Sequence, residues 1–305
     1  MKKTALSLLS FALIAVLALT VFSCKDDPAD PPTVTVFASV DGYQVAFTAT
    51  VTNADTYSWV FGDGESSADQ NPVYTYTQSG PYTATCTVTG DGGSVSASVD
   101  VVISASKLEM LTGGPSMANG KAWKFSPTSS TGDGIFYADA EMTLQDPVPD
   151  GILGLIGIPS EYLDEFIFHH DLSYTHVVEN DSATADIVYC MLNELGFRPT
   201  AEDVIVLAPH SPVAGTFTFT EDTDFIIEVT DQDFPETSET ITYSNMDVLE
   251  VAGGEFVGIM DFTRKYIIFD ISVDHVQIGF FISTTQGSNA NLPTHFVKMT
   301  LIPAV

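Results

Sequence analysis

The chain has 305 residues, enough for one large or two ordinary domains. Its formal net charge is −30 with only 10 lysines and arginines, which excludes a nucleic-acid partner because so few cations cannot neutralise phosphates. Such acidity suits a well-solvated surface outside the cell, and Ca²⁺ binding is the main alternative explanation for so many carboxylates.

Residues 1–23 have the layout of a secretory signal. Lys2 and Lys3 precede a largely apolar run over 5–22, which is also nearly long enough for a transmembrane span. The run ends in VFSC, which resembles the lipobox of bacterial lipoproteins. The resemblance implies cleavage before Cys24 and attachment of lipid to it, so that acyl chains such as palmitate anchor the protein in a membrane.

Lys25, Asp26 and Asp27 follow the lipobox directly. Acidic residues here resemble the surface-export signal of Bacteroidota lipoproteins, which implies a location on the outer membrane facing the cell exterior. An aspartate just after the cysteine signals inner-membrane retention in other bacteria, but position 25 is lysine. Residues 24–32 are rich in Pro and Asp without apolar periodicity, which predicts an extended tether.

A first domain is predicted over residues 33–104, centred on the segment WVFGDG. Tyr57, Trp59 and Phe61 share one face of a strand, and such a face must be buried against another sheet. The following GDG supplies a tight turn. The segment resembles the signature of the PKD domain, and NPVYTY and GPYTATCTVT continue the resemblance. It implies an immunoglobulin-like β-sandwich, a fold that most often serves as a spacer or interaction module.

Other signals in the first domain agree with a sandwich. Residues 45–51 and 95–103 alternate apolar and polar side chains, and with the intervening turns they predict six or seven short strands. Asp63 is interpreted as a turn former, so nothing here indicates catalysis. Cys86 and Cys190 fall in different predicted domains, and we therefore expect two free buried thiols.

Residues 105–305 are predicted to form a second, β-sandwich-like domain with about one helix. The helix is expected over 185–195, where apolar residues recur at helical spacing, and 107–111 predicts a single helical turn. The apolar segment 151–159 is interpreted either as a buried plug or as an exposed patch that meets a partner. The strand candidates are 121–125, 165–169, 215–220, 225–229, 240–243, 266–271 and 275–282.

The opening of this domain is LTGG at 111–114, followed by Trp123 and Lys124. It resembles modules that follow PKD domains in Bacteroidota surface lipoproteins, which are encoded with polysaccharide-uptake systems and are regarded as glycan-binding proteins. The resemblance implies non-catalytic binding of a polysaccharide beside an uptake transporter complex. Relatives often carry a paired tryptophan that this chain lacks, since Trp59 and Trp123 are its only tryptophans. An adhesion or structural protein with a protein partner is the alternative.

Sugar binding needs flat aromatic faces next to amide or carboxylate groups. Five aromatic residues lie on or next to predicted loops, and core packing is the alternative for each of them. These ligand-binding candidates are Trp123, Phe136, Tyr137, Tyr162 and Tyr174.

Paired carboxylates would instead indicate a glycoside hydrolase. The best cluster is Glu161, Asp164 and Glu165, but this spacing places Asp164 and Glu165 on opposite sides of a strand, unlike the aligned acids of family-sixteen-type hydrolases. We therefore expect a protein that is not an enzyme.

Metal sites are also considered. His169, His170 and His176 are interpreted as a partly exposed strand end, because adjacent histidines on a strand point in opposite directions and zinc needs three or four convergent ligands. Two D-x-D pairs are weak Ca²⁺ candidates, although no D-x-D-x-D-G loop is present. We expect no cofactor, with Ca²⁺ at these pairs as the alternative. The four aspartates are Asp222, Asp224, Asp231 and Asp233.

Overall fold

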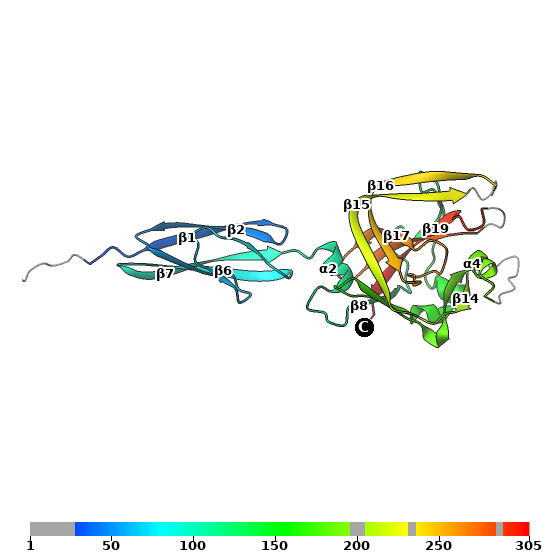
Figure 1. The fold of residues 1–305 in the computed structure, drawn as a ribbon, viewed down its shortest axis with the longest axis horizontal. Coiled ribbons are helices and arrows are strands. Elements are labelled where there is room, and N and C mark those ends of the chain that lie inside the picture. Colours follow the sequence, from blue (N-terminus) through cyan, green and yellow to red (C-terminus); the bar gives the residue numbers. More distant parts are fainter. Residues whose placement is uncertain (1–27, 196–204, 231–235, 285–288, 305) are drawn as a thin grey trace, which may run out of the picture. The chain divides into compact units, whose positions relative to one another are not determined.

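The structure is a computed structural model that describes residues 28–195, 205–230, 236–284 and 289–304. It divides into two compact units, of which the first ends at Ser104 and the second begins at Ala105. Strands dominate both units and the helices are short (Figure 1), which confirms the prediction of a mainly β protein. Among the described residues, no helix has the length and apolar character to cross a membrane.

The first unit is an antiparallel two-sheet sandwich. One sheet has the strand order β1-β2-β5 and the other β4-β3-β6-β7. Burial alternates along the strands, so one side of each sheet supplies the core. The strands are β1 (Thr33–Asp41), β2 (Gln44–Thr52), β3 (Thr56–Val60), β4 (Ser66–Ser67), β5 (Val73–Thr75), β6 (Gly80–Gly90) and β7 (Gly93–Ile103).

The WVFGDG segment organises this core as the sequence predicts. Trp59 and Phe61 are fully buried and pack on Phe47, with ring centroids 5.1 and 5.3 Å apart respectively. The hydroxyl of buried Tyr76 donates a hydrogen bond to the carbonyl of Phe61 at 2.8 Å. Gly62 turns the chain with a φ of 92°, and a Cβ there would lie 2.9 Å from a backbone oxygen of β6. The immunoglobulin-like sandwich is therefore confirmed.

The described residues of the second unit form twelve strands and several short helices. The strands are β8 (Lys121–Phe125), β9 (Gly134–Tyr137), β10 (Leu144–Pro147), β11 (Glu165–Phe168), β12 (Ser173–Val177), β13 (Ser182–Asp186), β14 (Ile205–Pro209), β15 (Gly215–Thr230), β16 (Ser238–Ala252), β17 (Lys265–Ile271), β18 (Val276–Ile282) and β19 (His295–Pro303). The helices are α2 (Lys107–Thr112), α3 (Ile152–Leu155), α4 (Ile187–Leu192) and the 3₁₀ turns η1 (Pro159–Tyr162) and η2 (Glu179–Asp181).

Ten of these strands form one antiparallel sheet that closes on itself. The order is β10-β9-β19-β18-β17-β16-β15-β12-β11-β8, and β8 pairs with β19 as well as with β11. Trp123 of β8 pairs with Phe166 of β11, while Phe125 of β8 pairs with Leu301 of β19. We call this arrangement the closed sheet.

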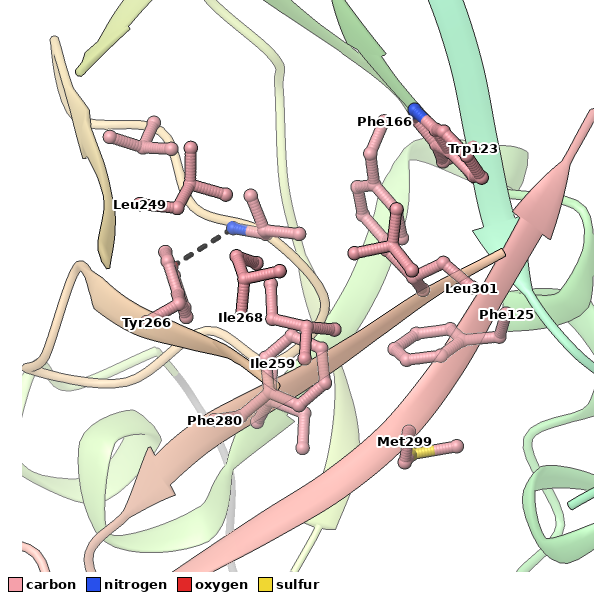
Figure 2. Close-up of a cluster of buried hydrophobic side chains, with 14 of the residues drawn as sticks. Trp123, Phe125, Phe166, Leu249, Ile259, Tyr266, Ile268, Phe280, Met299 and Leu301 are labelled. Atoms are coloured by element: carbon pink, nitrogen blue, oxygen red, sulfur yellow. Dashed lines mark hydrogen bonds between the residues drawn. The ribbon is translucent and has the colours of Figure 1, made fainter. Parts of the chain in front are cut away.

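The interior of the closed sheet is an apolar core. Figure 2 shows Trp123, Phe125 and Phe166 converging there with aliphatic side chains from β16 to β19. Its one labelled tyrosine, Tyr266, accepts a hydrogen bond from the N–H of Val257 at 3.0 Å, so the hydroxyl is not left unpaired.

A second layer covers the outer face of β17, β18 and β19. The hairpin β15–β16 shifts register between Thr220 and Phe225, beyond which its outer half packs back on the closed sheet. Phe225 stacks on Phe281 with ring centroids 5.0 Å apart, and Ile241 joins the same buried cluster. Two sheet layers thus face each other, which is the sandwich-like packing that the apolar patterns predict.

The helices are shorter than the pattern predicts. The helix expected over 185–195 is α4, which begins at Ile187 because β13 runs through Asp186. Asp186 caps it by accepting hydrogen bonds from two backbone N–H groups, at 2.7 and 3.1 Å. The turn expected over 107–111 is α2, and α3 is an additional turn within the apolar segment.

Candidate functional site

A polar groove lies where β17, β18 and β19 meet the loop after β8. It has a volume of about 400 Å³ and is lined almost entirely by hydroxyl, carboxylate, imidazole and amide side chains. We call it the polar groove, and its lining residues are Ser126, Thr128, Ser130, Thr131, Asp270, Asp274, His275, Gln277, Thr300 and Ile302.

Hydrogen bonds hold the side chains of the polar groove in place. His275 contacts Asp270 at 2.7 Å through Nε2 and Asp274 at 3.2 Å through Nδ1. The bond to Asp270 raises the pKa of His275, and Asp274 adds to the effect. Gln277 donates to Asp133 at 2.8 Å and to the carbonyl of Thr131 at 3.2 Å. The polar side chains of the groove are therefore preorganised.

Two half-buried aromatic rings adjoin the polar groove on the outer face of the sheet. Phe136 stacks on buried Phe296 at 4.7 Å, and Phe269 lies nearly parallel to the same ring at 6.0 Å. The amino group of Lys298 lies 5.3 Å from the ring of Phe136 and 4.7 Å from that of Phe269. Gly132 lies between the two features. A Cβ built on Gly132 would lie 3.1 Å from Nζ of Lys298 and 3.7 Å from Nε2 of Gln277, so the two rings lie next to the polar groove.

The five aromatic residues predicted to bind sugar differ in how exposed their rings are. Trp123 and Tyr174 are 0 and 1% exposed, which corrects their prediction, because neither ring can offer a face to a sugar. Each has its polar atom satisfied inside, through 2.8 and 2.6 Å bonds to backbone carbonyls. Phe136 is half-buried beside the polar groove and Tyr137 is exposed. Tyr162 is half-buried, and its hydroxyl accepts a bond from a backbone N–H of α3.

A second cavity is apolar and was not predicted. Its volume is about 640 Å³, and eleven of its sixteen lining residues are aliphatic or aromatic, including Phe125, Ile152 and Leu153. Part of the apolar segment 151–159 lines it, with Leu153 and Ile158 buried. Leu155 of the same segment is 71% exposed, so the segment is partly plug and partly surface.

His295 is the basic group of the apolar cavity. Burial lowers its pKa, which favours the neutral ring. Its Nδ1 lies 2.9 Å from the hydroxyl of Thr294 and 3.3 Å from that of Thr284, whereas its Nε2 has no partner. The cavity thus combines an apolar wall with a few polar groups, as small-molecule sites do.

The carboxylates considered for hydrolysis do not line an open cleft. Glu161 and Asp164 are each 1% exposed. Glu161 accepts hydrogen bonds from the N–H and hydroxyl of Thr184 through one oxygen. Burial raises its pKa to about 7, with Asp164 adding to the effect. Asp164 accepts a bond from the N–H of Glu179 at 2.8 Å, so both acids serve as acceptors within the fold.

Only two of the four Ca²⁺ candidates lie among the described residues. Asp222 and Asp224 are exposed on the register shift of β15, and they belong to no group of three converging ligands among the described residues. Asp231 and Asp233 lie outside the described residues.

One group of potential metal ligands occurs elsewhere in the described part of the chain. It consists of His176, His210 and Glu255, whose ligand atoms all lie within 4.8 Å of one another. His176 is therefore not part of an exposed strand end, because its side chain is fully buried on β12. Burial raises the pKa of Glu255, but the two histidines and the N–H of Val213 outweigh it and lower that pKa to about 2. The partners of His176 could not be predicted from the sequence, because His210 follows β14 and Glu255 follows β16, both far from His176 along the chain.

Comparison with known proteins addresses mainly the first unit. Residues 29–104 match the family model of the PKD domain. The PKD1 domain of the Vibrio cholerae metalloprotease PrtV is 30% identical over 25% of this chain and 100% of that chain, with a TM-score of 0.24. The PKD1 domain of Vibrio anguillarum Epp is 25% identical over 26% of this chain and 99% of that chain, with a TM-score of 0.25.

A wider but weaker likeness extends over both units. A structure of carbohydrate-binding modules from the β-sandwich superfamily covers 91% of this chain and 93% of that chain at 11% identity, with a TM-score of 0.25. A likeness of this size carries no argument about ligands. No curated protein matches the chain.

Proposed function

We propose that this chain is a surface lipoprotein that binds an extracellular polysaccharide without breaking it. In this proposal lipid on Cys24 holds it at the outer membrane, the PKD domain serves as a spacer, and the second unit binds the glycan. The observation that carries the proposal is the polar groove with Phe136 and Phe269 beside it. The resemblance of the 111–124 opening to surface glycan-binding proteins supports the same assignment.

The chemistry of the polar groove suits a sugar chain. Carboxylates such as Asp270 can accept hydrogen bonds from sugar hydroxyls, and so can the amide oxygen of Gln277, whose N–H groups are held by Asp133 and Thr131. The accessible parts of the Phe136 and Phe269 rings supply the apolar contact that the C–H face of a sugar ring requires. Because the groove lies on the outer face of the sheet, a polymer can pass along it without entering the core.

The test is affinity electrophoresis of residues 25–305 in gels cast with soluble polysaccharides. We expect one glycan to retard the chain, and Asp270→Asn or Phe136→Ala to abolish the retardation. Phe37→Ala is the matched control, because Phe37 is an exposed phenylalanine of the first unit. Equal mobility with every glycan would refute the proposal and favour the alternative of an adhesion protein. Retardation that both groove variants retain would refute the assignment of the groove.

The apolar cavity favours a second candidate function, the binding of a small molecule with an apolar body. Its volume of about 640 Å³ falls within the range of ligand pockets, and its lining is mainly aliphatic. A fatty acid or similar probe should raise the midpoint of thermal unfolding, and Ile152→Trp should abolish this effect by filling the cavity from a half-buried position. An unchanged midpoint with every apolar probe would exclude this function.

A further inference from the structure

Three side chains from separate segments meet at one end of the closed sheet. His176 comes from β12, His210 follows β14, and Glu255 lies between β16 and β17. The side chains of His176 and Glu255 are fully buried, and that of His210 is 12% exposed. Phe256 packs against both imidazoles, with ring centroids 4.9 Å apart in each case. The group is thus a nearly closed site, of which only His210 is partly exposed.

We propose that His176, His210 and Glu255 bind a divalent transition metal ion of the zinc class. The distances between their atoms match those of ligands around one ion. Oε2 of Glu255 lies 3.2 Å from Nε2 of His210 and 3.5 Å from Nδ1 of His176. Ligands about 2.0–2.2 Å from a tetrahedral ion are separated from each other by roughly 3.3–3.6 Å.

His176 has unmet hydrogen-bonding capacity. Neither of its ring nitrogens has a hydrogen-bond partner, although its side chain is fully buried. Its contacts with Glu255 at 3.5 Å and with Asp164 at 3.8 Å exceed the usual hydrogen-bond length of about 3 Å. An unpaired buried polar group is costly, and a metal ion on Nδ1 would remove that cost.

The negative charges around the site also favour a bound metal ion. Glu255 and Asp164 are buried carboxylates, and among the ion pairs of the described segments their partners are histidines alone. A bound divalent cation would offset both negative charges. Asp164 lies on the Nε2 side of His176, where a carboxylate commonly orients a metal-ligating histidine.

The donor set selects the class of metal. Two imidazole nitrogens and one carboxylate oxygen suit Zn²⁺ and its neighbours, whereas Ca²⁺ takes six or more oxygen ligands. Three protein ligands leave a fourth position for water. The ion would tie β12 to the segments after β14 and β16, so its binding should stabilise the second unit.

The experiment titrates Zn²⁺ by calorimetry into untagged residues 25–305 that have been stripped with EDTA. We expect one equivalent to bind and the thermal unfolding of the second unit to shift upward. His210→Gln should weaken binding about 100-fold or more, because it removes a direct ligand at a partly exposed position. His170→Gln is the matched control and should bind Zn²⁺ as the unchanged chain does, since His170 is exposed and is not one of the three ligands.

X-ray absorption at the zinc edge needs no variant and should show two imidazole nitrogens with oxygen ligands. The alternative is that a protonated His176 forms an ion pair with Asp164 and Glu255 and takes no metal. The absence of stoichiometric binding would overturn the metal site and favour that alternative. Binding that His210→Gln leaves intact, or that His170→Gln removes, would also overturn the site.

Discussion

Replacing Glu161 by glutamine tests the electrostatics of the second unit. The carboxylate is 1% exposed, and one of its oxygens has no hydrogen-bond partner. Burial raises its pKa from 4.5 to about 7. Glu161→Gln removes the charge, keeps the shape, and retains an oxygen that accepts the two bonds from Thr184.

The sign follows from proton linkage. Since the folded-state pKa of this acid is raised, the folded chain holds the proton more tightly than the unfolded chain does. The resulting stability is fully present below pH 4.5 and is lost as the pH rises through about 7. At about 1.4 kcal/mol for each pKa unit, the loss is about 1 kcal/mol at pH 5 and about 3 kcal/mol at pH 8.

The free energy of unfolding of the Glu161→Gln variant should therefore be higher than that of the unchanged chain, by about 3 kcal/mol at pH 8 and by about 1 kcal/mol at pH 5. The assay is urea unfolding of residues 25–305 in EDTA, which keeps metal ions out of the comparison. Glu250→Gln is the control, because Glu250 is exposed on β16 and its loss should leave the pH dependence unchanged. A variant that is no more stable at pH 8, or whose advantage is the same at both pH values, would refute the reasoning.

Three further predictions concern the cores. Trp123→Ala should destabilise the second unit by about 3–5 kcal/mol and leave the unfolding of the first unit unchanged in calorimetry; a smaller loss would argue against a packed indole. Gly62→Ala should lower the free energy of unfolding by about 1–2 kcal/mol more than Gly64→Ala does. Both glycines have positive φ, but only a Cβ at Gly62 would clash with backbone atoms. Equal midpoints of urea unfolding would contradict this. Burial raises the pKa of the Cys86 thiol, and it raises the pKa of the Cys190 thiol to about 11, so a thiol reagent should label neither cysteine before unfolding; rapid labelling of the native protein would refute this.

The first unit could be predicted because its signals are local. Period-two alternation places Trp59 and Phe61 on a buried face, and a glycine with positive φ follows where the turn is expected. The strand over 95–103 is predicted from the same alternation and is observed as β7. Each of these features depends on residues within a few positions of one another, so one sequence suffices to find them.

The fold of the second unit could not be predicted in the same way, because it depends on pairings between residues that are far apart in the sequence. Trp123 was predicted to border a loop, but β8 lies between β11 and β19, and the indole is buried in the core of the closed sheet. His176 was grouped with His169 and His170 by position in the chain, whereas its neighbours in space are His210 and Glu255. The apolar cavity likewise draws its lining from segments scattered between Phe125 and Met299.

The closure of the sheet also constrains how the second unit folds. Phe125 and Leu301 pair although most of the second unit's sequence separates them. Bringing them together costs chain entropy before the contacts that stabilise the pairing have formed. Until β19 arrives, β8 and β18 present unpaired edges that can join to another chain. In the first unit, β1 with β2 and β6 with β7 are adjacent hairpins, so more of its strand pairing is local. Refolding should therefore proceed in two stages, with a fast first unit and a slow, aggregation-sensitive second one.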